Sequence, residues 1–241
     1  MHQERSDGIC KTQVIVTRPA PDGEAFARAL EAAGMSAILS PVIEIVPREE
    51  RPALDGVAAI AFTSANGARA FARNAAAPPI PAFAVGAMTA AAARAAGFDE
   101  VHAATGDVAG LARLIAAHRP AGDVLHICGD DRAGDLAGLL AEAGLAARRL
   151  VLYKAKPAEG LSPAALRAIG AGAADYVALF SPRSARLFVA QAAAAGLVER
   201  LSTLHAACLS EAVAAAARAP FRSFVIPAER TAASMIARLR R

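Results

Sequence analysis

Several features that mark particular classes of protein are missing from this sequence. Tryptophan is absent, aromatic residues make up only 5% of the chain, and there are three cysteines: Cys10, Cys128 and Cys208. None of them forms a CxxC pair or lies at metal-ligand spacing from a histidine, so neither a disulfide scaffold nor a zinc site is predicted. The five histidines are scattered without partner spacing. We therefore expect no bound metal.

Motifs and segments of other classes are missing too. The sequence has no GxGxxG after its first predicted strand, and no GxxxxGK[ST], HExxH or GxSxG, so we expect no nucleotide cofactor and no covalent nucleophile. Its polar first residues, MHQERSDGICKTQ, do not resemble a signal peptide, and no uncharged apolar run reaches membrane-spanning length. The net charge is +4, but no Lys/Arg-rich block follows a nucleic-acid pattern. We expect a cytoplasmic protein with neither a membrane nor a nucleic-acid partner.

What remains is an alternation of short apolar runs with longer segments rich in alanine and leucine. The chain has 241 residues, of which 55% are hydrophobic, enough for one large domain or two of ordinary size. Strands are predicted over 14–19, 37–47, 59–64, 82–86, 101–105, 124–129, 148–157, 176–181, 205–210 and 223–228. Helices are predicted over 24–34, from 65 onward, and over 88–97, 108–118, 133–143, 163–171, 183–195, 211–218 and 230–240. This alternation is typical of an α/β fold with mainly parallel sheets.

The chain also repeats itself. FTSANGARAF, residues 62–71, matches FSPRSARLF, residues 180–188, with Ser64 on Ser181 at an offset of 117 residues. Two further segments match at an offset of 110, and Thr89 falls on Ser210 at 121; the two segment pairs are 24–34 on 134–144 and 40–47 on 150–157. Growing offsets are what loop insertions produce, so we infer two similar α/β units of roughly 110 residues each.

Small hydroxyl residues recur where predicted strands turn into helices. Ser64, Thr89, Ser181 and Ser210 each lie at or just after such a turn. The unpaired amides and partial positive charge of a helix N-terminus favour anions, and a hydroxyl there either caps the helix or donates to a ligand. Capping alone explains any one of them. Four in matching places indicate an anion-binding cleft shared by the two units.

Other candidate residues follow from position. Arg18 follows the first strand, where it either reaches the cleft or stays on the surface. Gly129 lies at the matching turn of the second unit, where glycine lets a backbone approach a ligand. Asp130 and Asp131 are interpreted as acids at a helix start. Tyr153, on an extended segment between the units, either donates a hydrogen bond to a ligand or simply packs there.

Together these segments resemble a known family. VIVTRP, SPVIEIVP, FTSANGARAF, VGAMTAAA, ICGDDRAG, VLYKAKP, FSPRSARLF and ACLSEAVAAA occur in the order and spacing of the uroporphyrinogen-III synthases, over about residues 14–240. The resemblance implies two similar flavodoxin-like parallel-sheet domains linked by two extended strands. Domain 1 would be discontinuous, and the ranges implied are 1–39 with 158–241 for domain 1, 48–149 for domain 2, and 40–47 and 150–157 for the interdomain strands.

The same resemblance implies an activity. The family closes linear hydroxymethylbilane into uroporphyrinogen III, with loss of water and inversion of ring D, on the way to haem, sirohaem and corrinoids. It would be a cofactor-independent hydro-lyase, here a monomer, that passes through a cation and a spiro intermediate. Its substrate is a polyanionic tetrapyrrole, which suits the basic chain, and positioning would be its main work.

Site residues are implied as well. Tyr153 matches the family's candidate for helping the hydroxyl leave, and the substrate-binding candidates are Arg18, Ser64, Gly86, Thr89, Gly129, Ser181, Arg183 and Ser210. The sequence departs from the family where ACLSEA lacks the glycine that VGAMTA keeps at Gly86, and where Arg183 adds a charge. Two alternatives stay open: a non-catalytic two-lobed binding protein for a small anionic ligand, and an inactive relative with the same fold.

Overall fold

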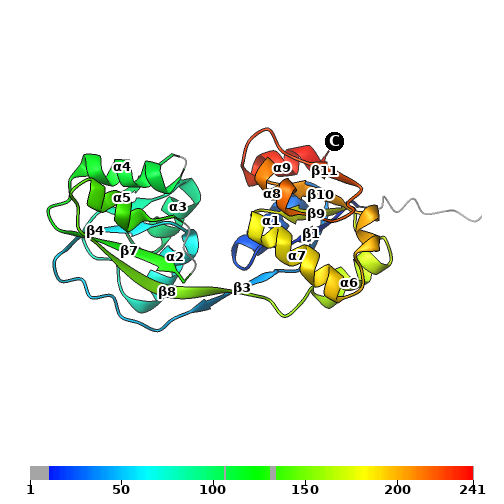
Figure 1. The fold of residues 1–241 in the computed structure, drawn as a ribbon, viewed down its shortest axis with the longest axis horizontal. Coiled ribbons are helices and arrows are strands. Elements are labelled where there is room, and N and C mark those ends of the chain that lie inside the picture. The colour runs from blue at the N-terminus through cyan, green and yellow to red at the C-terminus, as the bar shows by residue number, and fades with distance from the viewer. Residues whose placement is uncertain (1–10, 106, 131–133, 241) are drawn as a thin grey trace, which may run out of the picture. The chain divides into compact units, whose positions relative to one another are not determined.

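The structure of the chain, a computed structural model, describes residues 11–105, 107–130 and 134–240. It divides into two compact units. Unit 1 consists of the described residues up to Glu44 together with those from Pro157 onward, and unit 2 of Ile45–Lys156. Each unit is a sheet with helices on both faces (Figure 1). Within the described residues no helix is both long and apolar enough to cross a bilayer.

Unit 1 has a five-stranded sheet in the order β11-β10-β9-β1-β2. Its strands are β1 (Gln13–Val16), β2 (Ser36–Leu39), β9 (Tyr176–Leu179), β10 (His205–Cys208) and β11 (Ser223–Val225). Its helices are α1 (Asp22–Ala32), α6 (Pro163–Gly170), α7 (Pro182–Ala194), the 3-10 helix η1 (Glu199–Thr203), α8 (Glu211–Ala216) and α9 (Ala232–Leu239). All its strand pairs are parallel, and counted along the unit the order is the flavodoxin-like 2-1-3-4-5.

Apolar side chains alternate between the two faces of this sheet. Ile15 and Val177 point to the layer of α6, α7 and α8, whereas Val14 and Val16 point to the layer of α1 and α9. A strand that is apolar on both faces must be covered on both. The continuous apolar run of β1 therefore requires helices on both sides of the sheet.

Unit 2 has a six-stranded sheet in the order β3-β8-β7-β4-β5-β6. Its strands are β3 (Ile43–Pro47), β4 (Val57–Phe62), β5 (Ala82–Ala84), β6 (Val101–Ala103), β7 (Asp123–Gly129) and β8 (Ala147–Pro157). Its helices are α2 (Ala65–Asn74), α3 (Ala87–Ala95), α4 (Val108–His118) and α5 (Leu136–Glu142). α2 and α3 cover one face with Phe62 and Leu125, and α4 and α5 cover the other with Phe83 and Val124.

The two sheets have the same plan, joined along the chain in a different order. In unit 1 Val14 pairs with Ala37, and in unit 2 Val124 pairs with Ala147, so β1-α1-β2 corresponds to β7-α5-β8 at an offset of 110. Likewise β4-α2-β5-α3-β6 corresponds to β9-α7-β10-α8-β11. Unit 2 is thus a circular permutation of the flavodoxin-like order. The predicted α/β class with two similar, mainly parallel sheets is confirmed.

One predicted element needs correction. The extended segment over 37–47 is two strands, β2 and β3, and Ser40, buried between them, accepts a hydrogen bond from the Ser162 amide at 2.9 Å. The strand predicted over 148–157 is confirmed as β8, which is hydrogen-bonded to β7 over Ala147–Tyr153 and to β3 on its other side. Gly34 and Gly97 follow helices α1 and α3 with φ of 85° and 96°, as their predicted role in ending those helices requires.

Candidate active site

Four predicted site residues of unit 2 lie along one edge of its sheet. Gly129 ends β7, and Ser64 and Gly86 follow β4 and β5; Tyr153 lies within β8, where it pairs with Gly129, and the four strands are neighbours in the sheet. Because the strands from β8 to β5 run parallel, their carboxyl ends meet at this edge, where open α/β sheets bind ligands. We call these residues the unit 2 edge.

Ser64 and Tyr153, which are 89 positions apart in sequence, are hydrogen-bonded in this edge. The Ser64 hydroxyl oxygen lies 2.7 Å from the Tyr153 phenol oxygen. Ser64 is also the N-cap of α2 and accepts a hydrogen bond from the Gly67 amide at 3.1 Å. Capping, one of the two explanations for this serine, is therefore confirmed, and its hydroxyl also contacts Tyr153; donation to a ligand stays a prediction.

The Tyr153 ring packs directly against Gly129. A β-carbon at position 129 would lie 2.8 Å from ring atoms Cε2 and Cζ of Tyr153 and 3.1 Å from its hydroxyl. The Gly129 backbone also hydrogen-bonds the phenol. Glycine is thus required here by a protein side chain, and the predicted approach of a ligand to its backbone stays a prediction.

The surroundings of Tyr153 keep its phenol protonated. Its side chain is 9% exposed, and burial raises its pKa above the ordinary value, with the charges of Cys128 and Asp130 acting in the same direction. The hydrogen bonds from Ser64 and Gly129 oppose this shift. A phenol is protonated at neutral pH even at its ordinary pKa of about 10, so Tyr153 is a hydrogen-bond donor there, and the raised pKa disfavours its phenolate form.

Behind this edge lies a histidine that sequence reasoning left unassigned. His126 on β7 is 7% exposed, and its Nε2 lies 3.0 Å from the Thr63 hydroxyl. Burial, helped by the charge of Arg149, lowers its pKa from 6.5 to about 4. The imidazole is therefore neutral at physiological pH. Its hydrogen bond holds Thr63, the residue before Ser64.

Arg149 ties the turn after β7 to the neighbouring strand. Its guanidinium donates to the Gly129 carbonyl at 2.6 Å and to the Asp130 carbonyl at 3.4 Å. The Asp130 carboxylate accepts from the Ala155 amide at 3.2 Å, so Asp130 is not an acid at a helix start as predicted; the N-cap of α5 is Asp135. Asp131 lies outside the described residues. These bonds hold Gly129 under the Tyr153 ring.

A cysteine completes the surroundings of Tyr153. Cys128 is a buried free thiol, and its burial raises its pKa, opposed by Arg149. A protonated thiol is a poor nucleophile. Cys128 is therefore a packing residue here.

In unit 1 the predicted residues occupy the corresponding edge. Arg18, Ser181 and Ser210 follow β1, β9 and β10, which are neighbours in the sheet. Arg18 forms an ion pair with Asp22 at 3.1 Å and lies 4.7 Å from the centre of the Phe180 ring, next to Ser181. We call these residues, with Arg183 in the first turn of α7, the unit 1 edge.

The hydroxyls of this edge have local roles. Ser181 is the N-cap of α7 and forms a reciprocal capping box with Ser184, whose hydroxyl lies 3.0 Å away. Ser210 is the N-cap of the six-residue helix α8, and its side chain makes no capping hydrogen bond. Capping thus explains Ser181 in the described structure but not the hydroxyl of Ser210.

The predicted equivalence of Thr89 with Ser210 is wrong. Strand register matches Phe62–Ala84 with Leu179–Cys208, an offset of 124 along β5 and β10. Ser210 therefore corresponds to Gly86, and both are N-caps. Thr89 is the third residue of α3, is 6% exposed, and corresponds to the buried Val213. Gly86 leaves the start of α3 open, because a β-carbon there would meet nothing within 4 Å.

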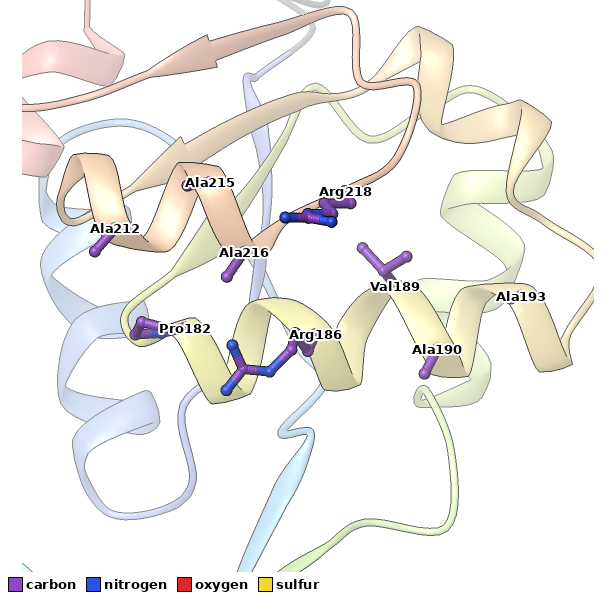
Figure 2. Close-up of a pocket in the computed structure, with 9 residues that line it drawn as sticks. All are labelled: Pro182, Arg186, Val189, Ala190, Ala193, Ala212, Ala215, Ala216 and Arg218. Atoms are coloured by element: carbon purple, nitrogen blue, oxygen red, sulfur yellow. The ribbon is translucent and has the colours of Figure 1, made fainter.

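Two surface grooves lie between neighbouring helices. One, of about 580 Å³, runs between α7 and α8 and is lined mainly by alanines, with Arg186 and Arg218 (Figure 2). The other, of about 360 Å³, runs between α4 and α5 and includes Arg113 and Glu142. Neither contains a predicted site residue, so the two sheet edges remain the candidate site.

The chain matches the family model of uroporphyrinogen-III synthase HemD over residues 24–237. Among solved structures it is similar to the uroporphyrinogen-III synthetase of Helicobacter pylori, with a TM-score of 0.64 and 16% identity over 94% of this chain and 97% of that chain. It is also similar to a mutant uroporphyrinogen III synthase of Thermus thermophilus, with a TM-score of 0.49 and 21% identity over 94% and 96% of the two chains. No curated protein gave a significant match. The family match covers most of the chain and the first likeness shows the fold, so this chain belongs to the uroporphyrinogen-III synthase family.

Proposed function

We propose that this chain closes hydroxymethylbilane to uroporphyrinogen III, with loss of water and inversion of ring D. Membership of the uroporphyrinogen-III synthase family supports this activity. The single structural observation that supports a reaction, beyond binding alone, is the protonated phenol of Tyr153 at a sheet edge, held by Ser64 and Gly129.

Tyr153 assists the departure of the hydroxyl group from the linear substrate. The neutral phenol donates a hydrogen bond, and then its proton, to the leaving oxygen, which departs as water. The resulting cation is attacked by the last ring to give the spiro intermediate. A proton released as the product forms restores the phenol.

Carboxylates of the substrate are bound at the helix starts of the two edges. Ser64 and Gly86 begin α2 and α3 in unit 2, and Ser181 begins α7 in unit 1. Amides at a helix start together with the helix dipole favour carboxylates. Arg18 and Arg183 add positive charge at the unit 1 edge. Ser210 and Thr89 are assigned smaller shares, because α8 is short and Thr89 is buried.

The finer expectations follow from this assignment. We further propose that the working form is a monomer and that it acts in the cytoplasm. Gel filtration with light scattering at assay concentration measures the oligomeric state. A dimer that dissociates with loss of activity would contradict it.

An isomer assay tests the proposed activity. Hydroxymethylbilane is supplied fresh to the purified chain, the products are oxidised, and isomers I and III are separated by chromatography. We expect isomer III well above the level without protein. Isomer I alone, as in spontaneous closure, would contradict the proposal. Tight binding of the substrate with no isomer III would instead indicate a binding protein.

A further inference from the structure

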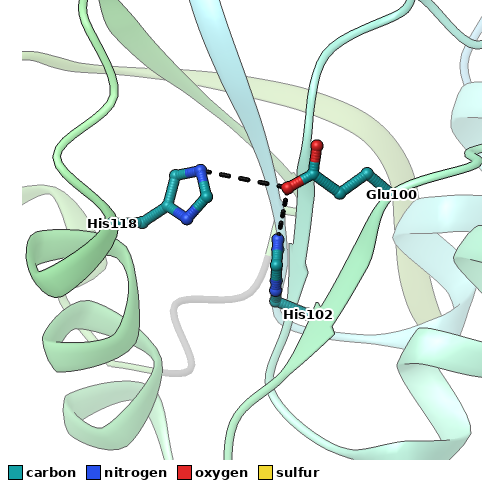
Figure 3. A group of neighbouring side chains, drawn as sticks. All are labelled: Glu100, His102 and His118. Carbon is teal, nitrogen blue, oxygen red and sulfur yellow. Dashed lines mark hydrogen bonds and ion pairs between the residues drawn. The ribbon is translucent and has the colours of Figure 1, made fainter.

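Two histidines and a glutamate of unit 2 lie close together near the amino ends of its strands, at the opposite end from Ser64. Glu100 precedes β6, His102 lies on β6, and His118 is the last residue of α4. One carboxylate oxygen of Glu100 lies 2.7 Å from Nε2 of His102 and 4.0 Å from Nε2 of His118 (Figure 3). The ligand atoms of all three residues lie within 4.8 Å of one another. The interpretation that the histidines are scattered is therefore wrong for these two.

We propose that Glu100, His102 and His118 bind a divalent transition-metal ion of the Zn²⁺ type. Two imidazoles and a carboxylate are a common ligand set for Zn²⁺, which binds nitrogen and oxygen at about 2.0–2.2 Å. Ligand atoms around a tetrahedral ion at that range lie about 3.4 Å apart. The observed separations of 2.7 and 4.0 Å bracket this value, so small side-chain rotations suffice.

The two imidazoles are held in place by packing. Phe83, which is fully buried, stacks on His102 with ring centres 5.1 Å apart and meets His118 edge-on, also at 5.1 Å. The two histidine rings are 5.0 Å apart. Rings fixed by a buried neighbour lose little freedom when they bind an ion, which favours a preorganised site.

Charge and access also favour a cation. His118 ends the 11-residue helix α4, where the negative end of the helix dipole attracts positive charge. The side chains of His102, His118 and Glu100 are 35%, 37% and 55% exposed, so an ion can enter and keep a water as its fourth ligand.

The position implies a stabilising role apart from the reaction. β6 is an edge strand of the sheet, and α4 runs from its carboxyl end back to the amino end of β7. The ion would therefore link strand β6 to helix α4 near the amino ends of the strands. Ser64 and Tyr153 lie toward the carboxyl ends of the strands of the same sheet. We expect it to raise the stability of unit 2 without changing turnover.

Metal titration of the full chain, after treatment with a chelator, tests the site. Zn²⁺ is followed by calorimetry and Co²⁺ by its visible absorption, which distinguishes nitrogen and oxygen ligands from thiolates. We expect one equivalent bound without a thiolate band, and a rise in melting temperature of roughly 5 °C at saturating Zn²⁺. No binding to the folded chain, or a thiolate spectrum, would overturn the proposal.

Variants assign the ligands. His102→Gln and His118→Gln are each expected to weaken Zn²⁺ binding by about 100-fold or more, since even partners outside the ligand set often matter that much. His205→Gln, in unit 1, is the matched control and keeps the affinity. Glu100→Gln serves if a histidine variant fails to fold, because that side chain is the most exposed of the three. Unchanged affinity in Glu100→Gln and in the folded histidine variants would overturn the assignment.

Discussion

Unit 1 and unit 2 share a five-strand order, but at two positions matched by strand register unit 1 has an apolar side chain and unit 2 a polar one. At the offset of 110 residues, Val16 corresponds to His126 and Leu39 to Arg149. Each apolar residue of unit 1 is thus replaced in unit 2 by a residue that can donate or accept a hydrogen bond.

The serines at the two edges show what this difference does. Ser64 and Ser181 occupy the same N-cap position, and each accepts a hydrogen bond from its own helix. Ser64 has the Tyr153 phenol as its second partner, whereas Ser181 turns to Ser184. One scaffold therefore carries an edge with a hydrogen-bonded tyrosine in unit 2 and an edge with an arginine ion pair and capping serines in unit 1.

Exchange of the tyrosines gives the largest expected effect. Tyr153→Phe should lower turnover by about 100-fold, because loss of a positioned acid costs at least that much. Tyr176→Phe in unit 1 changes the chain's other tyrosine and should leave turnover near wild type. Steady-state rates and circular dichroism of both variants measure this. Equal losses in the two folded variants would remove the distinction between the units.

The packing of Gly129 against the Tyr153 ring gives the next largest expected effect. Gly129→Ala places a β-carbon 2.8 Å from the Tyr153 ring, so we expect a loss of about 1–3 kcal/mol in stability, as for other overpacked sites, together with reduced turnover. Gly160→Ala is the control, since a β-carbon there meets nothing within 4 Å. Denaturant unfolding compares the two. A Gly129→Ala variant as stable and active as Gly160→Ala would contradict the packing described here.

His126 gives unit 2 a pH dependence that Val16 cannot give unit 1. Its pKa of about 4 in the folded chain lies below the unfolded value of 6.5, so between these values the unfolded state binds more protons and stability falls as the pH falls. From pH 7 to pH 5 the expected loss is about 2 kcal/mol. His126→Val, which copies unit 1, should remove this part of the slope. An unchanged slope in the variant would show that other groups cause it.

The matched serines separate capping from site function. Ser64→Ala and Ser181→Ala should each cost about 1 kcal/mol in stability through loss of the cap. Ser64→Ala should reduce turnover more than Ser181→Ala, because of these two serines only Ser64 is hydrogen-bonded to Tyr153. In the Tyr153→Phe background, Ser64→Ala should then cost little further turnover. Fully additive losses of turnover would mean that the two residues act separately.

The smallest effects are expected at Ser210 and Thr89. Ser210→Ala should lower turnover by about threefold, the value of one ordinary hydrogen bond, since backbone amides share the bound carboxylate. Thr89→Ala should change it less, because Thr89 is inside α3. Rates at saturating substrate measure both. Complete loss of activity in either folded variant would contradict sharing by the backbone.

Much of the fold could be predicted from the sequence. Apolar strands and capped helices are local features, and glycines such as Gly34 and Gly97 mark helix ends by their chemistry. The offset of 110 is confirmed by strand register for β1 with β7 and for β2 with the start of β8, and the offset of 117 by the N-caps Ser64 and Ser181. The offset of 121 is wrong, because alanine-rich helices match at almost any register and only the strand pairing fixes the value of 124.

The site could be predicted only in part. The turn residues follow from the rule that strand ends bind ligands, but the Ser64–Tyr153 bond joins strands 89 residues apart, and no local pattern contains it. His126 is missed by sequence reasoning because a lone histidine in an apolar run is typical of a core residue. The repeat contains a signal for it, because Val16 in β1 occupies the position that matches His126 in β7. His102 and His118 meet only because α4 returns along the sheet.

The most direct measurement is the isomer composition formed from fresh hydroxymethylbilane by the wild-type chain, Tyr153→Phe and Tyr176→Phe in parallel. Our account predicts predominantly isomer III from the wild type and from Tyr176→Phe. From Tyr153→Phe it predicts slow conversion that approaches the isomer I of spontaneous closure. Isomer III formed at the wild-type rate by a folded Tyr153→Phe variant would contradict the account, because the chemistry would then not depend on the phenol that sets the unit 2 edge apart from the unit 1 edge.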